Sequence, residues 1–152
     1  MNIQNYLDEM GAAYRLSHHP MTYTAQDLAS AEHVPGRQVI KPVVVKADGH
    51  FVMCALPASH RIDMSALREQ LEAEDVKIAD EQKLRELFPD CELGAEPPIG
   101  RLYNMPTLMD ESLVADAHVT FQAGTHCQAI TMSLAEYRRV AQPEMGYFGR
   151  HL

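Results

Sequence analysis

The sequence lacks the features that mark a membrane protein, a disulfide-linked domain or a zinc site. Its 152 residues contain no run of about 18 apolar residues, and Asp8 and Glu9 stand where a signal peptide needs its apolar stretch. The three cysteines are an odd number, widely spaced and without a CxxC pair. We therefore expect a soluble, cytoplasmic protein with no membrane partner, no metal and no other cofactor.

Signatures of several common enzyme classes are also absent. The chain has no GxSxG motif, P-loop or dinucleotide fingerprint. The adjacent His18 and His19 do not suit one metal ion, because neighbouring side chains on a strand point to opposite faces. Cys54 and Cys127 fall within predicted strands as small core residues, and Cys91 has no histidine partner in the sequence. These features argue against a thiol hydrolase.

Basic residues are scarcer than acidic ones. Thirteen Lys and Arg face 21 Asp and Glu, and the formal net charge is −8. This balance disfavours binding to a long nucleic-acid backbone, so we expect no DNA partner. A local basic patch can still hold the end of an RNA, and its candidate members are Arg37, Lys41, Lys46, Arg61 and Arg101. Arg138 and Arg139 either extend this patch or form a solvated helix face.

Helix and strand patterns alternate along the chain, which predicts a single domain over residues 1–152. Helices are expected over residues 3–10 and after caps at Thr24, at Asp63 or Ser65, at Asp80, and at Ser133 within a full capping box. Strands are expected over residues 14–17, 39–47, 50–56, 76–79, 119–122 and 127–132. These elements predict an α+β fold with a mixed, partly barrel-like sheet of about six strands surrounded by helices. The tail after Pro143 is expected to be loosely held.

One apolar strand, QVIKPVVV from Gln38 to Val45, is interrupted by Lys41 and Pro42. Lys41 is either a lysine at a sheet edge with its ammonium in water, or a cation fixed beside a pocket. In the second case it can hold a carboxylate, a phosphate or a carbonyl oxygen. Pro42 favours an edge or a bulge and biases Lys41 toward extended geometry.

A long segment rich in glycine and proline, residues 90–106, follows the predicted helix at Asp80. Its central part is either an ordinary turn or the wall of a small pocket whose exposed amides bind a substrate carbonyl. The residues of that part are Gly94, Ala95, Glu96, Pro97, Pro98, Ile99 and Gly100.

A second glycine-containing turn, Gly124-Thr125-His126, joins two predicted strands. His126 is either an exposed turn residue or, if the turn projects toward the long loop, a group that orients a hydroxyl, a phosphate or a water.

Five phrases in a fixed order resemble a known family. They are QVIKPVVVKADG, LPASHRID, LFPDCELGAEPPIG, MPTLMDESL and AGTHCQAITM, and the resemblance runs from about residue 14 to residue 140. The chain resembles the YbaK-type, or prolyl-tRNA-synthetase-associated, domain family of aminoacyl-tRNA deacylases. This resemblance implies a free-standing editing enzyme whose partners are the acceptor end of an aminoacyl-tRNA and, in some cases, a synthetase.

The resemblance also implies roles for particular residues. Lys41 matches the family's strand lysine, which engages the 3′-terminal adenosine or the aminoacyl end. Gly94 to Pro98 match its GxxxP loop, which positions the ester carbonyl, and His126 matches a histidine present in some free-standing members. Asp110 matches a recurrent acid for which we expect a structural role.

Two residues depart from the family pattern or complicate it. Several branches carry a small polar residue where this chain has Pro42, so their substrates do not transfer directly. Glu96 either faces solvent or places a carboxylate unfavourably near a phosphate-bearing substrate.

Three functional hypotheses follow. The first is a deacylase that removes alanine, serine or threonine from mischarged tRNA by positioned attack of water. The second is a catalytically silent module that binds aminoacyl ends or a synthetase, which Pro42 and Glu96 would favour. The third is hydrolysis of a small ester or amide by Cys54 or Cys127.

Overall fold

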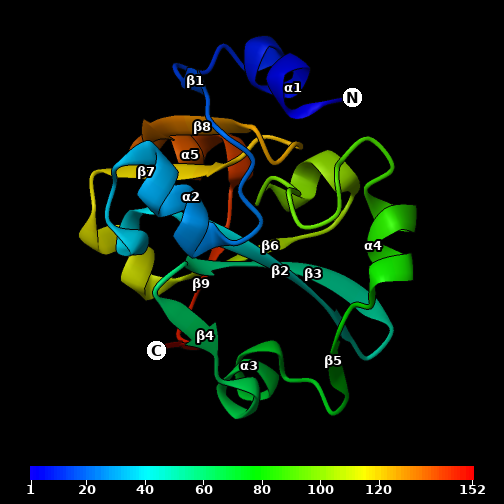
Figure 1. Ribbon diagram of the computed structural model, residues 1–152. Coiled ribbons are helices and arrows are strands. Elements are labelled where there is room, and N and C mark those ends of the chain that lie inside the picture. Colours follow the sequence, from blue (N-terminus) through cyan, green and yellow to red (C-terminus); the bar gives the residue numbers. More distant parts are fainter.

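The computed structural model describes residues 1–152 as an arrangement of strands with short helices around them (Figure 1). The α-helices are α1 (Ile3–Glu9), α2 (Ala25–Glu32), α3 (Met64–Leu71), α4 (Glu81–Leu87) and α5 (Leu134–Ala141). Three 3-10 helices are η1 (Gly36–Gln38), η2 (Gly100–Tyr103) and η3 (Glu111–Ala115). The strands are β1 (Arg15–His18), β2 (Ile40–Ala47), β3 (His50–Pro57), β4 (His60–Ile62), β5 (Val76–Ile78), β6 (Thr107–Asp110), β7 (His118–Gln122), β8 (Gln128–Ser133), β9 (Glu144–Gly146) and β10 (Gly149–His151).

The strands form three sheets. The largest has the order β5-β2-β3-β6-β9, and it is mixed because β3–β6 and β6–β9 are parallel pairs while the others are antiparallel. A three-stranded sheet has the order β1-β8-β7, and β4 pairs with β10. A single bridge between Val39 and Thr120 connects β7 to the start of β2. The expected α+β class with a mixed sheet is confirmed, although there are more strands than the expected six.

The β2–β3 hairpin lies in the middle of the large sheet. Asp48 and Gly49 form its turn with positive φ angles of 46° and 89°, conformations that favour glycine and are tolerated by aspartate. The two strands stay in register from Ala47 opposite His50 to Ile40 opposite Pro57.

Pro42 fits into β2 because its nitrogen points away from β3. Ala58 N–H donates a hydrogen bond to the carbonyl of Val39. Because hydrogen-bonded pairs alternate along an antiparallel ladder, the odd-numbered residues of β2 are the ones that bond to β3. Val44 is even-numbered, and its backbone carbonyl accordingly accepts a hydrogen bond from Ala79 N–H on the other side of β2. β5 pairs only with residues 45–47, so this edge is open at Pro42 and no ladder bond is lost there.

The helices begin at the predicted caps. Thr24, Asp63, Asp80 and Ser133 each accept a hydrogen bond from the backbone N–H three residues further on. Of the two candidates for α3, the cap is Asp63 and not Ser65.

Only half of the capping box at Ser133 forms. The carboxylate of Glu136 does not return to the Ser133 N–H but accepts from the N–H of Ala13, at 2.8 Å, and pairs with Arg139. These contacts hold the pKa of Glu136 at about 2, with the Arg139 bond as the largest cause. The side chain therefore ties the segment before β1 to α5.

The expectation of a loose C-terminal tail is wrong. The tail returns to the body of the protein as β9 and β10, and Phe148 between them is buried. Buried Asp110 accepts the N–H groups of Phe148, at 2.9 Å, and Gly149, at 2.7 Å. Asp110 therefore has the structural role expected of it, because it fixes the path of the tail.

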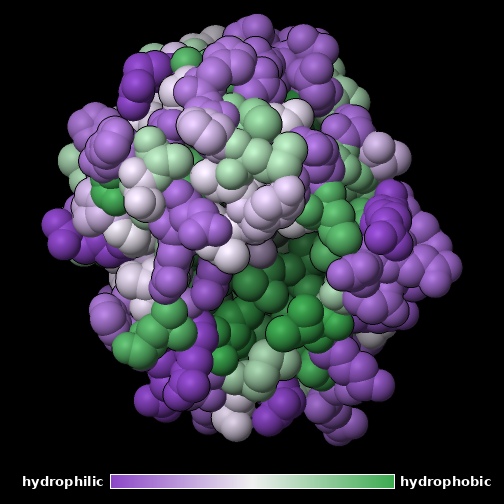
Figure 2. Space-filling view, in the orientation of Figure 1, coloured by the Kyte–Doolittle hydropathy of each residue, from purple (hydrophilic) through white to green (hydrophobic).

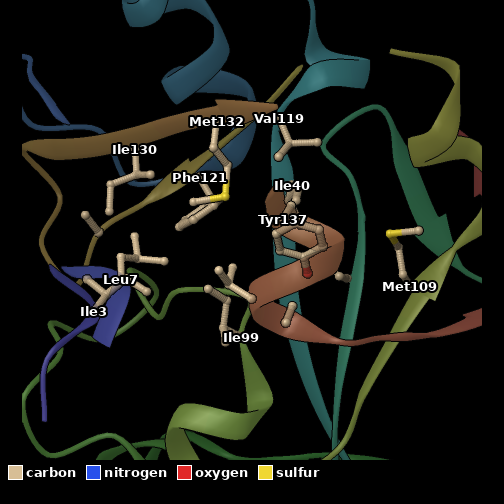
Figure 3. Close-up of a cluster of buried hydrophobic side chains, with 14 of the residues drawn as sticks. Ile3, Leu7, Ile40, Ile99, Met109, Val119, Phe121, Ile130, Met132 and Tyr137 are labelled. Carbon is tan, nitrogen blue, oxygen red and sulfur yellow. The ribbon is translucent and has the colours of Figure 1, made fainter. Parts of the chain in front are cut away.

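The largest buried cluster lies between the three-stranded sheet, α1, α5 and the start of the large sheet (Figure 3). Phe121 of β7, Ile130 of β8 and Tyr137 of α5 are fully buried within it. Ile99, from the long loop, belongs to the same cluster. The core therefore holds one end of the loop in place. None of the helices has both the length and the apolar character needed to cross a lipid bilayer.

Candidate functional site

The long loop and the turn before β8 are joined by hydrogen bonds on two sides. Glu92 N–H donates to the carbonyl of Gly124 at 2.8 Å, and Gly124 N–H donates to the carbonyl of Ala95 at 2.9 Å. His126 contributes its backbone N–H to Glu92 Oε1 and its ring Nε2 to the carbonyl of Leu93, at 2.9 and 2.8 Å. The structure thus brings together the two segments that the sequence left separate.

The C-terminal half of the loop is held by buried groups. The hydroxyl of Tyr137 donates to the carbonyl of Pro98 at 2.6 Å, and Tyr137 is fully buried. Burial raises the pKa of Tyr137, which keeps the hydroxyl a donor. Gly100 lies so close to the next turn that a Cβ there would meet the carbonyl oxygen of Met105 at 2.5 Å. Only glycine therefore fits at the end of this segment.

Most of the loop amides are already in use, contrary to the expectation of several exposed donors. Ala95 and Ile99 donate to carbonyls within the loop, and Gly100 donates to the hydroxyl of Thr107. Gly94 donates to the side chain of Glu96. Pro97 and Pro98 carry no amide hydrogen. Among residues 94–100, only the backbone N–H of Glu96 has no partner in the chain, so it is the donor of this part of the loop that can serve an incoming carbonyl oxygen.

A cavity of about 290 Å³ lies between β2 and the loop. Glu96 forms its polar side, and Pro42, Val43, Val44, Ile78, Ala79 and Leu84 form the remainder. Figure 2 shows a hollow with an apolar floor near the middle of one face, over the region where Figure 1 places β2 and β3. Glu96 is only 5% exposed, so it does not simply face solvent.

Lys41 is not among the residues that line this cavity, although its neighbours Pro42 and Val43 are. Side chains alternate along β2, so Lys41 lies on one face with Val45, while Pro42 and Val44 lie on the other. The ammonium is half-buried and has no hydrogen bond or ion pair in the structure. Burial lowers the pKa of Lys41 from its ordinary value. A half-buried cation without a counter-ion is suited to receive an anion from outside the chain.

His126 is buried, not an exposed turn residue. A carbonyl can only accept, so the bond to Leu93 places a ring proton on Nε2. Nδ1 is buried without a partner, and the ring packs against Tyr23 with 5.3 Å between centroids. A Cβ at Gly94 would meet His126 Cε1 at 3.5 Å, so the ring lies directly under the loop. Thr125 uses its hydroxyl within its own turn.

The basic residues proposed as a patch lie on several elements. Arg37 pairs with Asp116 at 3.2 Å, and Arg139 pairs with Glu136 at 2.8 Å. Lys46 lies over the ring of Phe51, five residues or roughly 16 Å along β2 from Lys41 and on the opposite face of the strand, so it does not belong to a patch around Lys41. Arg61, Arg101 and Arg138 are exposed and form no ion pair.

Two of the three cysteines are poorly suited to act as nucleophiles. Cys54 lies in β3 as predicted, and burial raises the pKa of its thiol to about 12. Burial likewise raises the pKa of Cys91, to about 11, and this thiol contacts the hydroxyl of Tyr103. Because the thiolate is the reactive form, these values disfavour nucleophilic attack by either residue. Cys127 is not in a strand, contrary to the prediction; it lies in the turn before β8.

Two residues that support the site carried no signal in the sequence. Tyr137 resembles any core residue at helical spacing, and nothing local indicates that its hydroxyl reaches Pro98. Glu92 stands inside one of the family phrases, but its bond to the His126 N–H spans 34 residues. Both contacts depend on tertiary structure.

Comparison with known proteins identifies the family of this chain. The sequence model of the aminoacyl-tRNA editing domain family matches residues 19–140. The chain belongs to this family. It is also 26% identical over 149 residues to the multifunctional Ser/Thr-tRNA deacylase ProXp-y of Escherichia coli strain K12, covering 95% of this chain and 89% of that protein. The same identity and coverage hold for ProXp-y of Escherichia coli O157:H7.

Solved structures share the fold of this editing domain. A protein described as a candidate trans-editing enzyme for prolyl-tRNA synthetase superimposes with a TM-score of 0.87 at 20% identity, over 97% of this chain and 94% of that one. A hypothetical protein superimposes with a TM-score of 0.88 at 18% identity, over 97% and 99% of the two chains. Family and fold confirm the resemblance drawn from the ordered phrases.

Proposed function

We propose that this editing domain hydrolyses tRNA esters of small amino acids, with serine and threonine as the first substrates to test. Family membership supports the reaction, and the name of the Escherichia coli relatives suggests the two amino acids. The cavity of about 290 Å³ is just below the range of roughly 300 to 1,000 Å³ typical of pockets for larger ligands, which suits a small aminoacyl group.

In the proposed reaction, water adds to the carbonyl carbon of the ester and the bond from that carbon to the ribose oxygen breaks. The products are the free amino acid and a tRNA with a free terminal hydroxyl. The backbone N–H of Glu96 stabilises the negative charge that develops on the carbonyl oxygen. Lys41 holds a phosphate or another oxygen of the terminal adenosine, so the ester is fixed between β2 and the loop.

This proposal rests mainly on the backbone N–H of Glu96, which has no hydrogen-bond partner in the chain. Its loop is held by Gly124 and His126 on one side and by Tyr137 and the core on the other. A donor fixed in this way needs no reorganisation as the oxyanion forms. An aminoacyl ester is already activated, so positioning and one oriented donor can provide much of the acceleration without a side-chain nucleophile.

His126 contributes to the site by supporting the loop in this scheme. Its Nε2 proton is used by the Leu93 carbonyl, so that proton is not free to act on the substrate. Its Nδ1 is buried, so an incoming hydroxyl does not reach it in this arrangement. Loss of the ring should therefore reduce the rate without abolishing it.

A panel of tRNAs carrying matched and mismatched amino acids, incubated with the purified protein, tests the reaction. We expect release of serine, threonine or alanine from mischarged tRNA. Tight binding of charged tRNA without release of any amino acid would support the silent module instead. A co-purification with prolyl-tRNA synthetase and other synthetases would test the further proposal of a synthetase partner.

A further inference from the structure

Glu96 is a buried carboxylate without a cation. One oxygen, Oε1, accepts the Gly94 N–H at 3.1 Å, and the other, Oε2, has no hydrogen-bond partner. No lysine, arginine or histidine lies within 4 Å of the carboxylate. Oε2 is not a buried atom, so it opens onto the cavity and can be reached from outside the chain.

The cavity around Glu96 contains no group that can neutralise it. The other residues that line it are apolar, and Lys41 is not among them. A divalent metal does not suit the site either, because Mg²⁺ and Ca²⁺ need several oxygen ligands and only this carboxylate is offered. A ligand that enters the cavity can therefore supply the complementary charge. An organic ammonium fits, since it carries its own N–H donors and an apolar body that the cavity walls can contact.

An aminoacyl ester carries such a group next to its carbonyl. Its α-ammonium is attached to the carbon that bears the carbonyl, and Glu96 presents a free N–H and a free carboxylate oxygen from a single residue. We propose that the Glu96 carboxylate binds the α-ammonium group of the aminoacyl ester while the Glu96 N–H receives the carbonyl oxygen. This inference rests on the proposed ester hydrolysis and names the part of the substrate that this residue recognises.

A requirement for the free amine follows. An amine acylated on nitrogen is neutral, has fewer N–H donors and is larger, so it leaves the buried carboxylate unpaired. The site therefore rejects N-acylated aminoacyl-tRNA, a class that includes peptidyl-tRNA. The carboxylate also keeps the bound amine protonated, because an opposite charge nearby favours the charged form. A carboxylate in the GxxxP loop is thus favourable for binding the amino acid, whatever its effect on a distant phosphate.

The test compares seryl-tRNA with N-acetyl-seryl-tRNA for the wild type, Glu96→Gln and Asp90→Asn. The Glu96→Gln substitution keeps an oxygen for the Gly94 N–H but removes the charge. Asp90→Asn is the matched control, since Asp90 is an exposed carboxylate of the same segment with no hydrogen bond in the structure. The kcat/KM for both substrates and the Tm of each variant are measured.

We expect the wild type and Asp90→Asn to prefer the free amine by about tenfold or more, the effect of one hydrogen bond to a charged group. In Glu96→Gln, kcat/KM should fall by that factor for seryl-tRNA and stay unchanged for N-acetyl-seryl-tRNA. The ratio of the two kcat/KM values should therefore approach one. If its Tm is lowered, Glu96→Asp, which keeps the charge, should still prefer the free amine. Equal cleavage of both substrates by the wild type, or an equal loss on both in Glu96→Gln, would overturn the inference while leaving ester hydrolysis intact. Failure to cleave any ester would instead reject the proposed function.

Discussion

Replacing Tyr137 by phenylalanine tests how the loop is held. The substitution removes the 2.6 Å hydrogen bond to Pro98 and leaves a buried carbonyl without a donor, because no other group donates to it. An unsatisfied buried acceptor costs about 1 to 3 kcal/mol of unfolding free energy. For a protein of this size that corresponds to a fall in Tm of roughly 2 to 12 °C. Since Pro98 ends the GxxxP loop, kcat/KM for ester hydrolysis should fall as well.

Tyr6→Phe is the matched control for this experiment. The Tyr6 hydroxyl donates to the carbonyl of Val140, also at 2.6 Å, but this bond joins α1 to α5 and does not touch the loop. Urea unfolding and single-turnover deacylation are measured for both variants. We expect both to lose stability and only Tyr137→Phe to lose activity. A Tyr137→Phe protein that is as stable and as active as the wild type would refute the idea that this hydroxyl positions the loop.

Four further predictions concern the charge of Lys41, the ring of His126, the C-terminal tail and the cysteines. Because burial lowers the pKa of Lys41, binding of uncharged tRNA, which carries no amino group of its own at the acceptor end, should weaken with rising pH before the ordinary lysine value of about 10.4 is reached, and Lys41→Arg should remove this weakening. His126→Ala should slow deacylation less than Lys41→Ala does; an unchanged rate would remove His126 from the site. Phe148→Ala should lower the free energy of unfolding by about 3 to 5 kcal/mol in urea, since Phe148 is buried, and a change near zero would indicate a loose tail after all. Alkylation of accessible thiols should leave deacylation intact as long as circular dichroism shows a folded protein, because Cys54 is buried with a pKa of about 12.

The parts of the fold that follow from neighbouring residues could be predicted from the sequence. The Asp48-Gly49 turn and the cap at Thr24 depend on backbone conformations and hydrogen bonds within a few positions. β9 and β10 could not be predicted in this way. Each has three residues and pairs with a distant strand, β6 or β4, so neither has a periodic pattern of its own.

The sequence predicts which segments form the candidate site, but it does not predict how their atoms are arranged. The ordered phrases identified Lys41, the loop from Gly94 and the turn at His126. The sequence does not say which loop amide stays free, because that depends on bonds to Gly124 and to the side chain of Glu96. Nor does it say that Glu96 is buried, since the residues that share its cavity come from distant parts of the chain, among them Val44 and Leu84.

The central claim is that this protein hydrolyses an aminoacyl ester held between Lys41 and the loop. Single-turnover hydrolysis of mischarged seryl-tRNA and threonyl-tRNA by the wild type, Lys41→Ala and Lys46→Ala tests it most directly. Lys46 is the control because it is an exposed lysine at the other end of the same strand. We predict that the wild type and Lys46→Ala release the amino acid and that folded Lys41→Ala does so far more slowly. No release by the wild type, or equal rates for the two lysine variants, would contradict the account.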